Sequence, residues 1–570
     1  MSSSHHHDEV GVVGAFDALL SKTGPMGLWQ LIALTLVSVQ QIFAGTINTA
    51  PVFFQITPPF NCDVPGGFPE NNNWTVAQKL NISSPPLETR LETVGSLRDP
   101  CKYYAHVYSE LSSDYDEALV EANKLRADSP QAVCEHWQYD RASDMTHTAV
   151  TDFILVCADR LGFEYSQSAY FAAFTTGVFF GGLLGDSFGR KWVMSVATLL
   201  AGVASCALGF YPHYWLFVLG RVFVGLTLHA ASVVGFTLSL ELTNGKYRTL
   251  VGGLFFLPSA LGYTSVSAFA YWLRDWKLMH LALSAPLLLA SPLFFCFLPE
   301  SPRWLLVKNR VREAEQLMKR VARVNGKKYP ENVDFGAIVA EVAGTDGSQV
   351  PQTKYLTVFN IFSMSNCRFR NPRLLLRALN LFLNWFVNVM VYYGIVYNVS
   401  SYAGDKFVNN AIAGISEVPA YAMAAAILHW GRRRSLVATL AAAGLSLLLI
   451  PWLPSDSAWL VIVVAMLGKI LITVSFSVVY VITSEIYPTV IRSSGVAASS
   501  SFGRFGSMLG PYVAAIPKFD PSLRWTTETI FGTSAVVAAS LAIALPETAG
   551  KRLPETLEGA EHLVPLKTNR

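Results

Sequence analysis

The chain is a succession of long apolar runs separated by shorter polar connections. A helix of about 20 apolar residues crosses the ~30 Å hydrocarbon layer of a bilayer. Runs of that length occur in the first half near residues 28–47, 168–185, 192–211, 213–240, 250–272 and 278–298. Beyond a charged interval they recur near residues 375–397, 408–429, 435–453, 457–482, 493–516 and 526–545. The pattern predicts an all-α membrane protein with twelve transmembrane helices in two six-helix bundles.

The two halves carry matching polar motifs after corresponding runs. Each half has a glycine and basic residues after its second run, a glutamate seven residues before an arginine after its fourth, and a Pro-Glu pair after its sixth. The charged residues of these motifs are Asp186, Arg190, Glu241, Arg248, Glu300, Arg303, Arg432, Glu485, Arg492 and Glu547. A duplicated six-helix unit explains the repetition. We expect these groups to form ion-pair latches that hold the two bundles together in one conformation, with simple anchoring of helix ends as the alternative.

Composition and charge placement extend this picture. Of 570 residues, 52% are hydrophobic and 15% charged, which excludes an ordinary soluble domain. Basic residues gather on alternate connections, so the positive-inside rule places both termini in the cytosol. The predicted order is a cytosolic segment 1–26, a bundle 27–298 with an extracellular loop 48–167, a cytosolic linker 299–373, a bundle 374–546 and a cytosolic tail 547–570. The plasma membrane is the predicted location.

Several functional classes find no support in the sequence. The net charge of +3 gives no indication of nucleic-acid binding. No nucleophile–base pair, metal-ligand spacing or phosphate-binding loop occurs in the polar segments, so neither an enzyme nor a metal site is predicted. No cofactor is expected.

The connection 48–167 has the chemistry of an extracellular segment. Its four cysteines are Cys62, Cys101, Cys134 and Cys157, and its N-glycosylation motifs begin at Asn73 and Asn81. Disulfides and N-glycans form in oxidising compartments. Four cysteines allow three pairings, among which the sequence does not choose. A third glycosylation motif begins at Asn398, just beyond the seventh run.

An arginine inside the eleventh run is the leading candidate for substrate chemistry. Arg504 lies twelve residues after Arg492, which is about 18 Å along a helix and near the middle of the membrane. A charge at that depth costs on the order of 2.5–3.5 kcal/mol and normally faces a polar cavity. A guanidinium there favours a carboxylate or sulfate through paired hydrogen bonds. We therefore expect Arg504 to lie in a transport pathway.

The seventh run carries a polar and aromatic stripe. Asn384, Asn388 and Tyr392 recur every four residues, with Trp385 and Tyr393 beside them. This spacing places them on one helix face and predicts a cavity lining. The aromatic rings would also attract a substrate ammonium, by about 0.5–2 kcal/mol. Helix packing is the alternative for each residue.

Other polar residues within the runs have competing interpretations. Glu417 would balance a substrate ammonium, bind a coupling cation or, as the favoured interpretation, pair with Lys469 as scaffold. His229 is predicted at mid-depth, where it would border the site and make transport sensitive to pH near its usual pKa of about 6.5, or hydrogen-bond between helices. Arg221 lies about 30 Å of helix from Glu241 and is expected to reach the outer surface by snorkelling.

Coupling is left open by the first run. It contains no aspartate or glutamate between Gly27 and Phe60, and its polar groups are Gln40, Gln41 and Asn48. These amides would line the site, coordinate sodium or pack helices. Facilitated diffusion, exchange and symport with sodium or protons all remain possible.

Two groups of motifs carry a family resemblance. The first comprises Gly182-x-x-x-Asp186-x-x-Gly189-Arg190-Lys191 and Pro299-Glu300-Ser301-Pro302-Arg303; the second comprises the cysteine-bearing loop and residues 270–276, 416–421 and 485–492. The first group resembles the major facilitator superfamily, and the second resembles its organic cation/anion/carnitine transporter family. The likeness covers about residues 15–560. It implies two six-helix bundles, a central site, alternating access and a small organic ion as substrate.

The resemblance also bears on the substrate. Polyspecific cation carriers of this family have an acidic residue at the position of Arg504, whereas anion and carnitine-like carriers have arginine. At Tyr421 the anion carriers have lysine, and the tyrosine is similar to the carnitine branch. The resemblance implies a carboxylate-bearing zwitterion or anion. The alternatives are a polyspecific organic cation transporter that uses Glu417, and a membrane receptor with a carrier fold that transports nothing.

Overall fold

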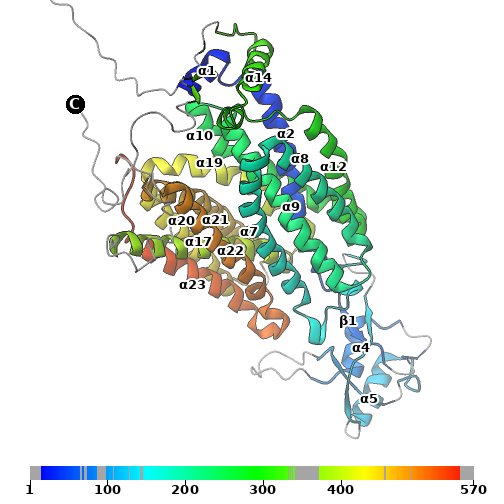
Figure 1. Cartoon of the computed structure of the whole chain (residues 1–570). Coiled ribbons are helices and arrows are strands. Elements are labelled where there is room, and N and C mark those ends of the chain that lie inside the picture. The colour runs from blue at the N-terminus through cyan, green and yellow to red at the C-terminus, as the bar shows by residue number, and fades with distance from the viewer. Residues whose placement is uncertain are drawn as a thin grey trace, which may run out of the picture.

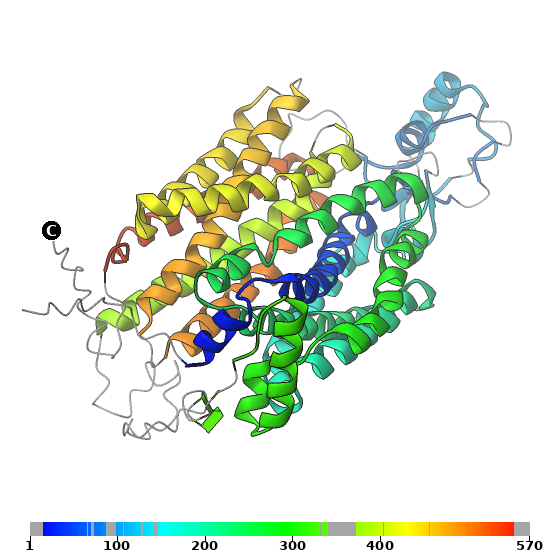
Figure 2. The ribbon, with the colours of Figure 1, turned by 90° about the horizontal axis from the view of Figure 1, so that it is seen from above.

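The computed structural model describes residues 15–551 except for 65–66, 70–72, 87–97, 107, 127–128, 141–144, 331–332, 334, 337, 340–371, 403, 455–456 and 489–490. Parts of the predicted cytosolic segment, linker and tail, at residues 1–14, 340–371 and 552–570, therefore lie outside the described residues. Long helices dominate and form two groups that lie side by side (Figures 1 and 2).

The N-terminal half contains the helices up to residue 297, apart from those within residues 55–161. They are α1 (Ala15–Thr23), α2 (Leu28–Thr49), α3 (Pro51–Phe54), α7 (Gly162–Phe188), α8 (Arg190–Ala207), α9 (Tyr214–Glu241), α10 (Gly245–Leu254), α11 (Leu257–Leu273) and α12 (Trp276–Phe297). Two short helices follow, α13 (Pro302–Val307) and α14 (Val311–Val324). Phe16 and Leu20 of α1 pack against Trp304 and Met318 of this pair, so the segment before α2 and the segment after α12 share one small apolar core.

The C-terminal half repeats this arrangement with differences in detail. Its helices are α17 (Pro372–Asn398), α18 (Lys406–Ile415), α19 (Glu417–Ile427), α20 (Arg432–Leu449), α21 (Ala458–Ile486), α22 (Arg492–Ala514) and α23 (Arg524–Ala542). The predicted eighth span is broken at Ser416 into α18 and α19. Pro419 has no backbone N–H to continue the ladder of α18, which explains the break one turn earlier.

Ten helical stretches of the described residues are long and apolar enough to cross a membrane. The predicted number of twelve is thus not confirmed. The two predicted runs that are not among the ten correspond to α22 and α23, which are helical over 23 and 19 residues. In α22 the reason is composition, because glycine, serine and Arg504 dilute its apolar residues.

Residues 55–161 form a small unit that projects from one end of the helices (Figure 1). Strand β1 (Phe60–Cys62) pairs antiparallel with β4 (Trp137–Tyr139), and β2 (Lys102–Tyr104) with β3 (Gln131–Val133). Helices α4 (Val76–Ser83) and α5 (Tyr115–Leu125) pack on them, and α6 (Ala149–Asp152) precedes α7. The disulfides are Cys62–Cys134 and Cys101–Cys157, which resolves the pairing that the sequence left open.

The three glycosylation motifs differ in exposure. Asn73 is exposed, whereas Asn81 is half-buried and donates a hydrogen bond to the Tyr115 hydroxyl. Asn398 is buried and its Nδ2 donates to Glu528 Oε1 at 2.9 Å. The Asn398 amide is therefore not available for a glycan in this conformation, because the nitrogen to which the glycan would be attached is enclosed between α17 and α23.

The two halves are hydrogen-bonded to each other near the end that carries residues 55–161, which we call the loop end. The bonds are Gln55 Nε2 to Tyr397 O, Gln167 to the Tyr397 hydroxyl, Tyr397 to Asn48 O, Ser168 to Met508 O, Asn410 Nδ2 to Ser267, and Lys518 Nζ to Glu164 Oε1. The opposite end, with Arg190, Glu241, Arg432 and Glu485, is called the basic end. The halves thus meet most closely at the loop end.

Candidate functional site

Arg504 is held at the junction of the two halves by close packing of α22. A carbon added at Gly506 would lie 2.2 Å from the Phe386 carbonyl oxygen of α17, and one added at Gly503 would lie 3.2 Å from the Trp385 carbonyl oxygen, so these glycines let the two helices approach closely. Arg504 then points toward α7, where its guanidinium carbon lies 4.0 Å from the centre of the Phe174 ring. Tyr393 of α17 is close enough to the same arginine to interact with it electrostatically. Arg504 itself is half-buried.

Phe174 connects Arg504 to the histidine of α9. The rings of Phe174 and His229 are stacked with centroids 3.3 Å apart and planes 3° from parallel. A parallel ring at that distance fills one face of Phe174, so the guanidinium occupies the other. His229 Nε2 lies 3.1 Å from the Tyr170 hydroxyl and 3.2 Å from Asn48 Oδ1. The structure thus brings Asn48, His229 and Arg504 into one cluster, which we call the central arginine site together with Phe174 and Tyr393.

The two cations of this region differ in their partners. Lys469 Nζ lies 2.9 Å from Glu417 Oε1, and both side chains are almost fully enclosed, with 0% and 3% exposed. Tyr392 donates its hydroxyl proton to the same carboxylate. Within the described part of the chain, no carboxylate forms an ion pair with Arg504. Of the three interpretations of Glu417, the contact present is the pair with Lys469.

The polar stripe of α17 divides into packing and lining residues. Asn384 and Asn388 are buried, and each donates its Nδ2 to a carbonyl one turn earlier, at 3.0 and 2.8 Å. Their Oδ1 atoms are buried without a hydrogen-bond partner in the structure. Trp385 is buried and donates to Thr483 Oγ1 at 3.0 Å, which fixes it between α17 and α21. Tyr392 remains half-buried.

The remaining predicted lining residues lie at some distance from one another in the fold. Gln41 is buried and donates to Gln40 Oε1 at 2.8 Å, and Gln40 in turn reaches Ser232 of α9 at 3.2 Å. These amides join two helices of the N-terminal half. Tyr421 is half-buried on α19, the helix that begins with Glu417.

The expectation that Arg221 snorkels to the surface is wrong. Its side chain is buried, its guanidinium donates to Gln167 Oε1, and it packs over the rings of Phe163, Tyr170 and Phe217. Counting residues along α9 gives a depth but not the direction in which a side chain points. That direction is inward, toward α7.

At the basic end of the N-terminal half, the predicted latch residues form one cluster. Arg190 makes a two-pronged pair with Glu241, with both N–O distances 3.0 Å, and a further pair with Asp186 at 2.8 Å. The Glu300 carboxylate accepts hydrogen bonds from the backbone N–H groups of Arg190, Lys191 and Ser301. Gly189 precedes this turn with a φ of +102°, a conformation that glycine adopts without strain.

The C-terminal half has the equivalent cluster. Arg432 Nε lies 3.2 Å from Glu485 Oε1, and Gly431 has a φ of +116°. Burial pushes the pKa of the Glu547 carboxyl upward, but hydrogen bonds from the backbone N–H groups of Ala549, Arg432, Arg433 and Arg434 outweigh it and hold the pKa below its ordinary value. Both clusters join helices of one half, so in this conformation they brace each half internally.

The other predicted latch residues have separate contacts. Arg248 pairs with Asp17 of α1 at 2.9 Å, Arg303 lies over the Phe16 ring, and Arg492 Nε donates to Tyr487 O. A latch between the halves through any of these groups stays a prediction for another conformation.

Sequence reasoning missed four residues of the central region, namely Tyr170, Phe174, Gln167 and Tyr397. Phe174 and Tyr170 are uncharged residues in an apolar run, so the sequence gives no signal that distinguishes them from packing residues. Gln167, Tyr170 and Phe174 do recur with helical spacing along α7, and this spacing could have indicated one helix face that is turned toward His229.

Comparison with known proteins gives a consistent result. The profile of the family described as "Sugar (and other) transporter" matches residues 136–558. The chain is 30% identical over 554 residues to an organic cation transporter protein of Drosophila melanogaster, covering 96% of this chain and 94% of that protein. It is 29% identical over 549 residues to organic cation/carnitine transporter 2 of Mus musculus, covering 95% and 93%.

A further relative is solute carrier family 22 member 21 of Mus musculus, 29% identical over 566 residues that cover 97% of this chain and 94% of that protein. Among solved structures, the xylose transporter XylE from E. coli in a partially occluded inward-open conformation has a TM-score of 0.56 at 16% identity, covering 92% of this chain and 100% of that chain. The structural likeness shows a shared fold.

Proposed function

This chain belongs to the sugar (and other) transporter family and, within it, to the organic cation/anion/carnitine transporters, and on that premise we propose that it carries small organic ions that bear a carboxylate. Membership makes it a multi-pass membrane transporter of organic ions rather than an enzyme. The proposal concerns the finer question of which ions it selects. Carnitine-like zwitterions and organic anions are the proposed substrates.

One observation carries the proposal, namely that Arg504 has no counter-charge in the described structure while Lys469 has one. A partly enclosed guanidinium gains most from an anionic ligand, because a charge-assisted hydrogen bond contributes about 1.5–3 kcal/mol. A carboxylate offers two oxygens that match the guanidinium fork. The zwitterion's ammonium would then lie against aromatic rings such as Tyr393.

The position of the site supports transport by alternating access. Phe174 and His229 come from the N-terminal half, whereas Tyr393 and Arg504 come from the C-terminal half. A substrate bound between them touches both halves, so a rocking motion of one half against the other would open the site to either side. The hydrogen bonds at the loop end hold that side closed in this conformation. We propose that the loop end faces outward from a plasma membrane and that both termini are cytosolic.

The rival proposal is an organic cation transporter in which Glu417 attracts the substrate. The name of the Drosophila relative favours it, since that protein is called an organic cation transporter. The contacts of Glu417 weigh against it, because Lys469 and Tyr392 already share its carboxylate. Sodium or proton coupling, with Gln41 and Asn48 as candidate ligands, stays a prediction.

The test compares two labelled substrates, carnitine and a quaternary amine of similar size without the carboxylate. Uptake is measured in cells that express wild type, Arg504→Gln or the exposed-residue control Arg320→Gln, with surface expression quantified for each. We expect Arg504→Gln to reduce carnitine uptake by about 10- to 100-fold, the equivalent of one lost charge-assisted bond. The control should transport as wild type does.

The rival makes the opposite prediction. It requires the amine to be taken up as well as carnitine by wild type. It also requires the double variant Glu417→Gln, Lys469→Met, which leaves no unpaired buried charge, to lose uptake of both compounds while still reaching the surface. Equal carnitine uptake by wild type and Arg504→Gln would remove the proposal. A protein that reaches the surface and moves neither compound nor any of a panel of dicarboxylates would support the receptor alternative.

A further inference from the structure

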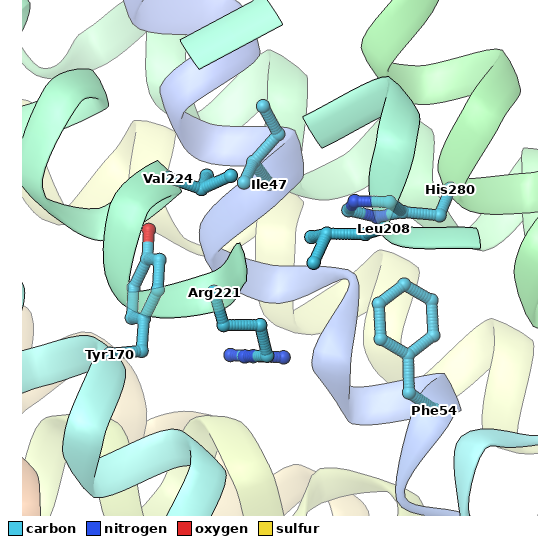
Figure 3. Close-up of a pocket in the computed structure, with 7 residues that line it drawn as sticks. All are labelled: Ile47, Phe54, Tyr170, Leu208, Arg221, Val224 and His280. Atoms are coloured by element: carbon cyan, nitrogen blue, oxygen red, sulfur yellow. The ribbon is translucent and has the colours of Figure 1, made fainter. Parts of the chain in front are cut away.

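A small cavity lies inside the N-terminal half toward the loop end, beside the central arginine site, to which its lining residue Tyr170 is hydrogen-bonded. Figure 3 shows its lining, to which α2, α3, α7, α9 and α12 contribute. The lining residues are Ile47, Phe54, Tyr170, Leu208, Arg221, Val224 and His280. Its room suits one atom-sized occupant, such as a water molecule or a monatomic ion. Apart from one arginine, one histidine and one tyrosine, the walls are hydrocarbon.

Arg221 brings an unbalanced positive charge to this cavity. Its side chain is 4% exposed, and within the described residues no carboxylate forms an ion pair with it. One guanidinium nitrogen donates to Gln167 Oε1, whereas Nε is buried without a hydrogen-bond partner. A charge so enclosed is costly unless another charge neutralises it.

His280 offers a second donor to the same space. It is 3% exposed, and its Nε2 lies 3.1 Å from the hydroxyl of Ser205. When Nε2 accepts the serine proton, the ring proton resides on Nδ1. Nδ1 is buried without a hydrogen-bond partner, and in this tautomer it carries the ring N–H. The Phe54 ring meets His280 edge to face, with centroids 5.3 Å apart.

We propose that this cavity binds a small inorganic anion of the chloride class between Arg221 and His280. The anion accepts hydrogen bonds from Arg221 Nε and His280 Nδ1, and its charge neutralises the guanidinium. Both donors are fixed by other contacts, Arg221 by Gln167 and His280 by Ser205, so they are already positioned for the ion. The apolar walls exclude further water and thereby strengthen the interaction.

The site is linked to the contact between the halves. Arg221 bonds to Gln167, and Gln167 donates to the Tyr397 hydroxyl of the C-terminal half. Tyr397 in turn donates to Asn48 O at 3.0 Å. An anion that fixes Arg221 also fixes this chain of bonds, and it therefore stabilises the closed loop end.

The experiment measures the melting midpoint of the purified full-length protein in sodium methanesulfonate, whose anion has no carboxylate, with chloride replacing methanesulfonate at constant ionic strength. Ligand binding to the folded state raises the midpoint. We expect an upward shift of about 2–4 °C for wild type at saturating chloride. The shift should disappear in Arg221→Gln and remain in Arg504→Gln, because the substrate arginine is a different site.

Three outcomes would overturn the proposal: no shift in wild type, a shift of unchanged size in Arg221→Gln, or a shift that Arg504→Gln abolishes. If Arg221→Gln cannot be purified, His280→Phe replaces it, since it removes the second donor and leaves the arginine. A full chloride shift in His280→Phe would then overturn it. None of these readouts depends on transport, so the result stands apart from the identity of the substrate.

Discussion

Two cations near the middle of helices in the C-terminal half, Lys469 and Arg504, have opposite surroundings. Lys469 of α21 is enclosed with Glu417, whose carboxylate also accepts a bond from Tyr392. Arg504 of α22 has an aromatic ring, a histidine beyond that ring and a tyrosine as neighbours, with no carboxylate in an ion pair among the described residues. A neutralised charge belongs to the scaffold, whereas a charge without a partner is free to recruit a ligand.

The largest expected effect is the loss of stability when the ion pair between Glu417 and Lys469 is broken. Glu417→Gln leaves the Lys469 ammonium enclosed without its partner, which should destabilise the protein by about 3–5 kcal/mol. Arg504→Gln removes a charge that no carboxylate balances, so it should leave the melting midpoint nearly unchanged. Thermal melts of the purified variants make the measurement.

The double variant Glu417→Gln, Lys469→Met is the matched control for that prediction. It removes both charges at once and should recover most of the lost stability, because no uncompensated charge is then left in the interior. Equal melting midpoints for wild type and Glu417→Gln would show that the pair contributes nothing to the scaffold.

The second prediction concerns the unpaired cation, Arg504, and its effect on carnitine uptake. Arg504→Lys keeps the positive charge but loses the planar fork that binds both oxygens of a carboxylate. Carnitine uptake should fall by about 10-fold, less than for Arg504→Gln, while the melting midpoint stays as in wild type. Full uptake by the lysine variant would mean that charge alone attracts the substrate.

A smaller effect is expected from Phe174, which positions the guanidinium. Phe174→Leu keeps the apolar volume but removes the cation–π contact, worth about 0.5–1 kcal/mol, so uptake should fall by about two- to fivefold. Phe179 is on the same helix and 64% exposed, so Phe179→Leu is the control and should transport normally. An unchanged rate in Phe174→Leu would indicate that Arg504 is held by its other neighbours.

The smallest predicted effect concerns Glu547 at the basic end, whose carboxylate accepts hydrogen bonds from backbone N–H groups and is expected to stabilise the protein in a pH-dependent way. Its lowered pKa means that its contribution to stability is fully present above the unfolded-state pKa of about 4.3 and is lost as the pH falls through the folded-state value. Partial exposure keeps the effect small. Melting midpoints of wild type and Glu547→Gln should differ at pH 6 and converge as the pH falls through 4; a constant difference would contradict the assignment.

Much of the helical arrangement follows from patterns that a sequence displays directly. Apolar runs predict where helices lie, and the repeated glutamate and arginine motifs indicate which helix ends correspond in the two halves. The pairing of Glu417 with Lys469 was the favoured interpretation because both are ionisable groups inside apolar runs. The predicted count of twelve spans is not confirmed, because α22 is rich in serine and glycine, and three of its glycines, Gly503, Gly506 and Gly510, pack against α17.

Other features depend on the direction of side chains and on contacts between distant segments. Depth along α9 was predictable for Arg221, but its inward direction follows from how α9 packs on α7. The stacking of Phe174 between Arg504 and His229 joins three helices from two halves, and no pattern within one helix reports it. The disulfide pairing likewise depends on which strands of residues 55–161 lie together.

The Cys101–Cys157 disulfide ties the projecting unit to the chain five residues before α7 begins. The unit is thereby mechanically coupled to the N-terminal half, and it should travel with α7 when the halves rock. A fluorescent dye on its surface, for instance at the exposed Asn73 position, would act as a lever arm that magnifies the tilt of the helices beneath it. An antibody or another protein that immobilised this unit would act on the carrier as a brake, without ever touching the substrate.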